Sequence, residues 1–231
     1  AFCRERRLWF VVDGIQQLGA VPMDVGRTPV DILVTGGHKW LNAPFGAGFM
    51  YINPAVRDRL RPSVAGYLSV TPPEGGWAEY FRTPSITPLQ PVSFTADARR
   101  YETGGTGNYP GAAGLAASLE LINSLGPASI ADHILGLTDL LIDGLSRLPV
   151  RVVTPRAPAC RSGIVTFGLG DVAREAALIE HLLDARIMVS HRYTSGVGGV
   201  RVSCHFFNAE SDVARLLEVT GAWLSASAPA R

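Results

Sequence analysis

Lysine is almost absent from this sequence. Of the 21 basic residues among 231, Lys39 is the one lysine and the other 20 are arginine. Arginine keeps its proton in proteins, whereas a lysine amine can lose its proton and attack an aldehyde. Lys39 is therefore a candidate nucleophile. The alternative is a stray lysine in an arginine-biased composition.

The chain also lacks a large net charge and long apolar runs. Its net charge is +1, which gives no electrostatic reason to expect nucleic acid or an anionic membrane as a partner. No apolar stretch approaches the roughly 20 residues that cross a bilayer, and no signal peptide is recognisable. We therefore predict a cytoplasmic protein whose partners include neither nucleic acid nor membrane.

Cysteine is scarce as well. Cys3, Cys160 and Cys204 are odd in number and widely scattered, which argues against a disulfide framework. The chain begins without methionine, and its first residues have the pattern of a helix end that leads into a buried strand. Because a domain rarely begins inside an element, we expect the C-terminal part of a longer polypeptide.

The first half of the sequence predicts three strands. Leu8–Val12 is a continuous apolar run, typical of a parallel strand that is covered on both faces. The other two strands are predicted at 32–35 and 48–52, and Asn53 caps a short helix predicted at 54–60. Residues 61–100 are rich in proline and predict an irregular, functional loop.

The second half predicts interleaved helices and strands. Helices are expected at 110–125, at 127–148, at 172–184 and at 211–224, and strands at 150–154, 163–169, 187–190 and 200–205. Short connections between them favour a small α/β layer with helices on one face. We assign 1–125 to one domain and 126–231 to a smaller one, joined by the long helix at 127–148.

Two chemically distinctive side chains follow predicted strands. Asp13 ends the first strand, and Lys39 follows the second. Open α/β sheets bind ligands at the carboxyl ends of their strands. A ligand site and a buried ion pair are both compatible with these two residues.

The surrounding motifs resemble one enzyme family. They are Asp-x-x-Gln-x-x-Gly from Asp13, His-Lys-Trp-Leu-x-x-Pro-x-Gly-x-Gly from His38, Tyr-Glu-Thr-Gly-Gly-Thr-Gly-Asn at 101–108, and Val-Arg-Val-Ser-Cys-His-Phe-Phe-Asn at 200–208. In type and order they resemble the class V aminotransferase family of pyridoxal-phosphate enzymes, which includes cysteine desulfurases and isopenicillin N epimerase. The resemblance implies fold type I, with part of a large, mostly parallel sheet and a small C-terminal α/β domain. The family's upstream half has no counterpart here.

The resemblance also implies roles for the residues of the first two motifs. Lys39 would hold pyridoxal 5′-phosphate as an internal aldimine and then move the proton at the substrate Cα. Asp13 would keep the pyridine nitrogen protonated, which makes the ring a better electron sink. Gln16 would donate to the ring oxygen, unless it is a solvated loop amide.

The phosphate of the cofactor has two implied ligands. His38 is one, although a core histidine bonded to backbone is an alternative. Thr106 would reach the phosphate of a partner subunit, which implies a homodimer with shared active sites. Desulfurases carry a serine where this chain has Gly36, so one hydroxyl is missing or comes from Thr35. A dinucleotide-binding loop at 105–111 is disfavoured, because no apolar strand precedes it.

The substrate is expected to be an amino acid. Arg201 matches the family's arginine for the substrate carboxylate, which a guanidinium binds in bidentate fashion. Arg192 is a weaker second candidate and could equally be a surface arginine. No metal ligands are assigned.

The desulfurases also use a cysteine on a loop before this arginine. Residues 186–200 contain none, and Cys204 follows the arginine inside a predicted strand, where packing is its expected role. Sulfur transfer through an enzyme persulfide is therefore disfavoured.

We accordingly predict a pyridoxal-phosphate enzyme that deprotonates an amino acid at Cα, with an aminotransferase as the first choice. Selenocysteine or C–S lyase, desulfurase-like and epimerase activities are alternatives. A truncated dimerisation or binding protein without catalysis is the rival from another class.

Overall fold

The computed structural model describes residues 1–87, 89, 91–102 and 105–227. They form two compact units. The first comprises residues 1–15 and 24–118, and the second comprises residues 16–23 and 119–231. The identification of 1–125 as a cofactor-binding domain and of 126–231 as a small domain stays a prediction.

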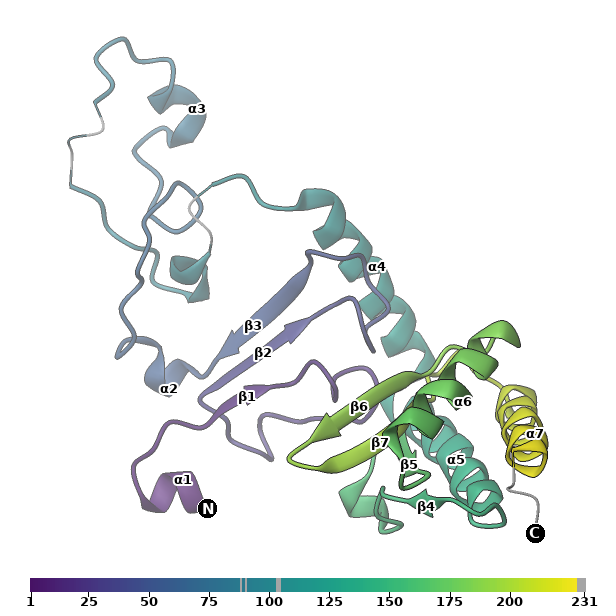
Figure 1. Cartoon of the computed structure of the whole chain (residues 1–231). Coiled ribbons are helices and arrows are strands. Elements are labelled where there is room, and N and C mark those ends of the chain that lie inside the picture. The colour runs from purple at the N-terminus through teal and green to yellow at the C-terminus, as the bar shows by residue number, and fades with distance from the viewer. Residues whose placement is uncertain (88, 90, 103–104, 228–231) are drawn as a thin grey trace. The chain divides into compact units, whose positions relative to one another are not determined.

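The first unit is built on a three-stranded sheet. Its strands β1 (Val11–Asp13), β2 (Ile32–Gly36) and β3 (Gly48–Ile52) lie side by side in that order (Figure 1). β1 and β2 are parallel, and β2 and β3 are antiparallel. Gly48 lies opposite Gly36, and a Cβ on Gly48 would lie 2.3 Å from the Thr35 carbonyl oxygen. This close strand approach therefore requires glycine at position 48.

The strand predicted at 8–12 is shorter and more exposed than expected. The ladder begins only at Val11, because the backbone before it is bonded elsewhere: Leu8 N–H donates to Cys3 O at 2.8 Å, and Phe10 N–H to an Asp31 carboxylate oxygen at 2.7 Å. Val11 is 55% exposed, and Leu8 and Trp9 are also exposed. The prediction that this strand is covered on both faces is wrong for this chain. An apolar run indicates a preference for burial but does not determine which element covers it.

The first unit also contains short helices. They are α1 (Phe2–Glu5), α2 (Pro54–Arg57), α3 (Gly76–Tyr80) and the 3-10 helix η1 (Ala98–Tyr101). The predicted cap of α2 is confirmed, because the Asn53 side chain accepts the Ala55 N–H at 3.0 Å. The helix ends three residues earlier than predicted. Among its described residues, the proline-rich stretch contains only α3, η1 and an isolated bridge between Val70 and Phe94.

A longer helix, α4 (Tyr109–Leu125), follows the motif at 101–108. Residues 109–118 belong to the first unit and the rest to the second. Helix α5 (Pro127–Leu145) starts after Gly126, whose φ is 86°. It ends three residues before the predicted boundary at 148.

The second unit is a four-stranded antiparallel sheet packed against three helices. Its strands are β4 (Arg151–Val152), β5 (Ile164–Gly168), β6 (Ser190–Thr194) and β7 (Val197–Ser203), in the order β4-β5-β7-β6 (Figure 1). The helices are α5, α6 (Val172–Asp184) and α7 (Glu210–Ala226), and a 3-10 turn, η2, spans Pro158–Cys160. Phe167 and Val200 of the sheet are fully buried against Leu141, Leu178 and Leu216 of the helices. Burying each such side chain stabilises the fold by about 1.5–3 kcal/mol.

The predicted position of the strand at 187–190 is wrong, because the observed strand β6 starts at Ser190. Arg186 has a φ of 62° and donates its N–H to Leu183 O at 2.8 Å, while Ile187 N–H reaches back to Leu182 O at 2.8 Å. These two bonds are a Schellman motif that ends α6. Ile187 therefore still belongs to the helix terminus, and the strand starts at Ser190.

Within the described part of the chain, no single helix is long and apolar enough to cross a membrane. The pair α4 and α5 meets the length and composition criteria together, but the chain bends by 79° between them.

Candidate active site

The carboxyl ends of β1 and β2 lie at the same edge of the first sheet. The strands are parallel, with Asp13 opposite Val34, and Gly14 N–H donates to Val34 O at 2.8 Å. The Asp13 carboxylate accepts the Ile15 N–H at 3.0 Å, which turns the chain away from the strand. Asp13 is exposed at this edge, as expected for a ligand-binding carboxylate.

Lys39 lies on a tight loop that continues from β2. Gly37 N–H donates to Ala47 O at 2.7 Å, and Ala43 N–H donates to Gly37 O at 2.9 Å, so the base of the loop is closed. Trp40 and Leu41 are buried, whereas Lys39 is exposed. The two buried neighbours thus anchor the loop and leave the lysine amine at the surface.

The same loop packs on one face of α4. The Ser118 hydroxyl donates to Leu41 O, and the Asn108 side-chain amide donates to Phe45 O at 3.4 Å. A Cβ on Gly114 would lie 2.7 Å from the Pro44 ring, so loop and helix are in direct contact there. Small and polar residues on α4 therefore fix the backbone that carries Lys39.

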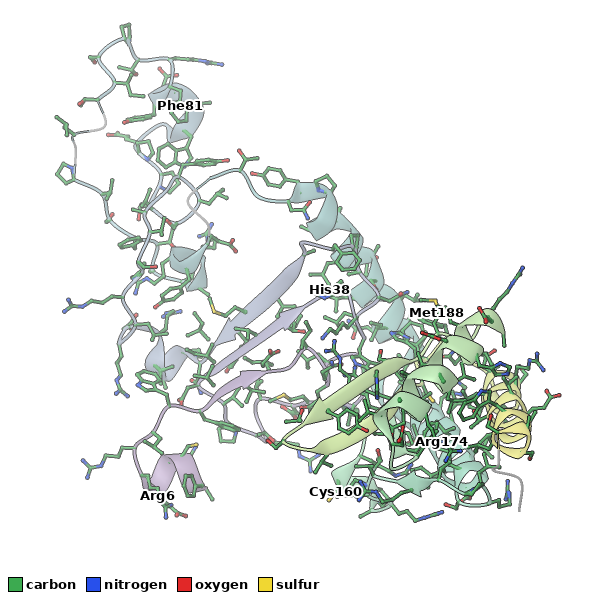
Figure 2. All side chains as sticks on the ribbon, viewed as in Figure 1. Arg6, His38, Phe81, Cys160, Arg174 and Met188 are labelled. Atoms are coloured by element: carbon green, nitrogen blue, oxygen red, sulfur yellow. The ribbon has the colours of Figure 1, made fainter. Side chains whose placement is uncertain are left out.

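His38 is held by an aromatic neighbour. Its ring, labelled in Figure 2, is half-buried. It stacks on Phe45, with 4.9 Å between centroids and 19° between planes. A Cβ on Gly36 would lie 3.1 Å from two atoms of this ring, so the glycine leaves the space that the imidazole uses. The Thr35 side chain is buried, and its hydroxyl donates to Gly36 O at 3.2 Å. This geometry does not favour Thr35 as a substitute for the missing serine.

Two other predicted cofactor ligands lie on less regular segments. Gln16 is half-buried in the turns after β1 and groups with the second unit. Thr106 is exposed, and its hydroxyl lies 3.5 Å from the Tyr67 hydroxyl. Thr103 and Gly104 of the same motif lie outside the described residues.

Sequence reasoning missed a pair of tyrosines beside Thr106. Hydrogen bonds with Thr106 and Tyr109 lower the pKa of Tyr67, and the hydrogen bond with Tyr67 raises the pKa of Tyr109. Tyr109 begins α4 directly after the motif at 101–108, and this position in the sequence could have marked it. The position of Tyr67 in the proline-rich stretch gave no such signal.

The two predicted substrate arginines share one face of the second sheet. Arg201 lies on β7 between the buried residues Val200 and Val202, and Arg192 lies on the neighbouring edge strand β6. Arg201 is half-buried, and its Nε is shielded from water without a hydrogen-bond partner among the described residues.

A buried carboxylate on α6 was not predicted. Glu175 is 1% exposed and accepts hydrogen bonds from Tyr193 Oη, from His191 Nε2 at 3.0 Å and from Leu169 N–H at 2.8 Å. Burial by itself would raise the pKa of Glu175, but the hydrogen bonds from Tyr193, Leu169 and His191 outweigh it and hold the pKa below its usual value. This carboxylate therefore ties β6 to α6.

Cys204 is a packing residue, as predicted. It belongs to the buried core of the second unit, and burial, with a contribution from Asp212, raises the pKa of its thiol to about 11. A thiol is nucleophilic as the thiolate, so Cys204 is poorly suited to attack a substrate sulfur.

The motifs and this arrangement agree with a comparison of the whole chain to known families. The family model for aminotransferase class V matches residues 1–216. The chain belongs to the class V aminotransferase family. Its predicted α/β fold, as part of a fold type I enzyme, is confirmed by the similarity to solved structures of this family.

Relatives and solved structures cover nearly all of this chain. Isopenicillin N epimerase of Streptomyces clavuligerus is 29% identical over 95% of the chain and 54% of its own length. A probable cysteine desulfurase of Pyrococcus abyssi is 30% identical over 94% of the chain and 52% of its own length. The apo cysteine desulfurase of Thermococcus onnurineus NA1 superposes with a TM-score of 0.80 at 26% identity, over 96% of this chain and 54% of that one. The chain thus spans about half the length of the relatives that it matches.

The cofactor of this family is pyridoxal 5′-phosphate, as predicted. One similar structure, C-DES, has a glycine linked covalently to this cofactor; it is 28% identical, with a TM-score of 0.77, over 93% of this chain and 51% of that one. Three side chains of the first unit suit pyridoxal 5′-phosphate. They are the exposed amine of Lys39, the exposed carboxylate of Asp13 and the imidazole of His38. These side chains offer a carbonyl-reactive nitrogen, a partner for a pyridinium and a phosphate ligand.

Proposed function

We propose that this protein is a pyridoxal-phosphate-dependent enzyme that removes the Cα proton of an amino acid, with the amine of Lys39 as the base. The observation that carries the proposal is the exposed position of the one lysine, on an anchored loop at the edge of the sheet where Asp13 also lies. When bound, the cofactor supplies an electron sink for the pair left on Cα.

Each of the other predicted cofactor ligands has a defined task in this proposal. The Asp13 carboxylate keeps a proton on the ring nitrogen by charge and hydrogen bonding. His38 binds the phosphate, with its ring oriented by Phe45. Gln16 donates to the ring oxygen. Thr106 serves the phosphate in the active site of a second copy of the chain, so the working form is a homodimer.

Arg201 binds the α-carboxylate of the substrate. A half-buried guanidinium with an unpartnered Nε gains more from a carboxylate than a solvated one does, because the ligand satisfies a shielded donor. Arg192 lies on the same sheet face and is the second substrate-binding arginine of the proposal.

Transamination is the first choice of reaction, and it needs the base, the sink, the carboxylate clamp and a keto acid that accepts the amino group. C–S bond cleavage is the second. It is supported by the similarity to the cystine C–S lyase C-DES, at 28% identity and a TM-score of 0.78 over 93% of this chain and 52% of that one. The raised pKa of Cys204 argues against a persulfide on that residue in either case.

The first test is spectroscopic. With added pyridoxal phosphate the protein should turn yellow, and borohydride should bleach the band and fix the cofactor covalently. Because the chain has one lysine, peptide mapping should find the label on Lys39 and not on the N-terminal amine. Lys39→Ala and the charge-retaining Lys39→Arg should both stay colourless. A wild-type protein that remains colourless, or a label confined to the N-terminus, would refute the proposal.

Reaction type and assembly are measured on the same material. Amino-group transfer from an amino acid to an added keto acid indicates transamination, racemised amino acid indicates epimerisation, and sulfide released together with a keto acid and ammonia indicates C–S cleavage. Light scattering after size exclusion reports the mass, and a monomer that carries the cofactor would contradict the role of Thr106.

A further inference from the structure

The sheet of the second unit has a helix-covered face and a face that carries arginines. Successive side chains of a strand point to opposite faces. Val200 and Val202 are packed in the core with the helices, so Arg201 between them points to the other face. On β6, His191 and Tyr193 both contact Glu175 of α6. Arg192 therefore points to the same face as Arg201.

Strand register places these two arginines next to each other. Arg192 lies opposite Gly199, and Ser190 lies opposite Arg201, so the arginines are diagonal neighbours. Such neighbours have Cα atoms about 7–8 Å apart, within reach of long side chains. Thr166 of β5 pairs with Arg201 from the other side. We call the surface formed by Thr166, Ser190, Arg192 and Arg201 the arginine face.

The arginine face carries two positive charges without acidic partners. Within the described residues, neither Arg192 nor Arg201 forms a hydrogen bond or an ion pair through its side chain, and the buried Nε of Arg201 has no acceptor. Other arginines of this unit do find carboxylates: Arg161 pairs with Asp139, and Arg156 pairs with Asp143 at 2.7 Å.

An unmatched pair of this kind fits an anionic ligand. Two adjacent like charges repel each other, and a shielded donor without an acceptor is unfavourable. A ligand with acidic groups removes both penalties. One carboxylate satisfies one guanidinium in bidentate fashion, so two arginines suit two acidic groups. The hydroxyls of Ser190 and Thr166 add neutral hydrogen-bonding capacity and no competing negative charge.

We propose that the substrate is an amino acid with a second acidic group on its side chain, such as a carboxylate or sulfinate. Arg201 binds the α-carboxylate, and Arg192 binds the side-chain acid and sets specificity. This inference rests on the proposed function, which supplies the amino acid, but it concerns side-chain selection and not the reaction.

The test compares matched ligands on the protein loaded with pyridoxal phosphate. Spectral titration with L-aspartate and L-asparagine, and with L-glutamate and L-glutamine, isolates the side-chain charge. We expect the better acidic ligand to bind at least about tenfold more tightly than its amide, as one charge-assisted bidentate contact allows. Arg192→Gln should abolish this preference and leave the affinity for the amide within about twofold. Arg201→Gln should weaken both ligands of a pair.

Arg174→Gln is the matched control. Arg174 is an exposed arginine on α6, away from the sheet face (Figure 2), and its replacement should leave every affinity unchanged. Because Arg192 is exposed on an edge strand, its variant should fold, and circular dichroism checks this. Equal binding of acid and amide by the wild type, or a preference that survives Arg192→Gln, would overturn the inference. The proposal that the protein binds pyridoxal phosphate would be unaffected.

A protein that takes up no cofactor would refute the proposed function, and the arginine face can still be tested on it. Calorimetry with succinate and with its monoamide needs no cofactor. Succinate binding that is lost in Arg192→Gln and retained in Arg174→Gln supports the two-acid site. Absence of succinate binding to the wild type refutes it.

Discussion

Gly36 is a single residue on which the geometry around His38 depends. The imidazole occupies space that a side chain at position 36 would need, with two ring atoms 3.1 Å from a hypothetical Cβ. The ring also stacks on Phe45, which is 82% exposed. Gly36 stands where the desulfurases carry a serine. This difference therefore affects the position of the His38 ring, in addition to removing a hydroxyl.

Gly36→Ser should therefore displace the His38 ring while the fold persists. The ring is half-buried and can give way, so we expect a destabilisation of about 1 kcal/mol or less. The measurement is the NMR shift of the His38 Hε1 proton, which should lose the ring-current effect of Phe45. Gly136→Ser, at a helical glycine with open space around it, is the control. An unchanged His38 shift in Gly36→Ser would show that the serine is accommodated.

At the scale of elements, α4 acts as the support of the lysine loop. Gly111, Gly114 and Ser118 recur at helical spacing, and a Cβ on either glycine would meet another residue closely: Asn108 near Gly111 and the Pro44 ring near Gly114. Ser118 adds the hydrogen bond to Leu41 O. The small residues of this helix therefore serve close packing, although each glycine lowers the intrinsic helix propensity.

Two helical glycines should respond in opposite ways to alanine. Gly114→Ala places a Cβ 2.7 Å from the Pro44 ring, and we expect a loss of about 1–2 kcal/mol despite the gain in propensity. Gly136→Ala on α5 meets nothing within 4 Å, so it should stabilise the protein by about 0.5–1 kcal/mol. Urea denaturation measures both. A stabilising Gly114→Ala would mean that the loop is not packed on α4 as described.

At the scale of the whole molecule, a buried acid couples stability to pH. Glu175 accepts three hydrogen bonds, which hold its pKa below the unfolded value. The charged form is thus favoured in the folded state. This contribution is fully present above the unfolded pKa of about 4.3 and is lost as the pH falls through the folded pKa.

We expect the free energy of unfolding to decline as the pH falls below about 4.5. At neutral pH, Glu175→Gln should cost about 2–4 kcal/mol, because a charged acceptor of three hydrogen bonds is lost from a buried position. The acid decline should be shallower in this variant. Glu180→Gln, on the exposed side of the same helix, should leave stability within about 0.5 kcal/mol. Urea denaturation at several pH values measures the free energy of unfolding of both variants. Equal free energies in Glu175→Gln and Glu180→Gln would contradict a structural role for Glu175.

Local sequence signals located some elements well and others poorly. The helix at 172–184 was predicted at its observed bounds, because the Asp171 side chain accepts the Arg174 N–H as an N-cap and apolar residues recur at helical spacing. The strand after it was misplaced, because a Schellman motif is usually marked by glycine and here Arg186 takes that place. Glu175 was missed because a glutamate in an amphipathic helix is typical of a solvent-facing position.

The sequence by itself determined the family and its cofactor and made Lys39 the candidate nucleophile, since these depend on which functional groups stand at which spacing, and a lone lysine is visible without coordinates. Only the tertiary structure decided that Arg192 and Arg201 share a face, that Gly36 makes room for His38, and that Glu175 ties β6 to α6. Each of these depends on strand register or on contacts between distant segments. A one-residue change of register would turn every side chain of a strand to the opposite face.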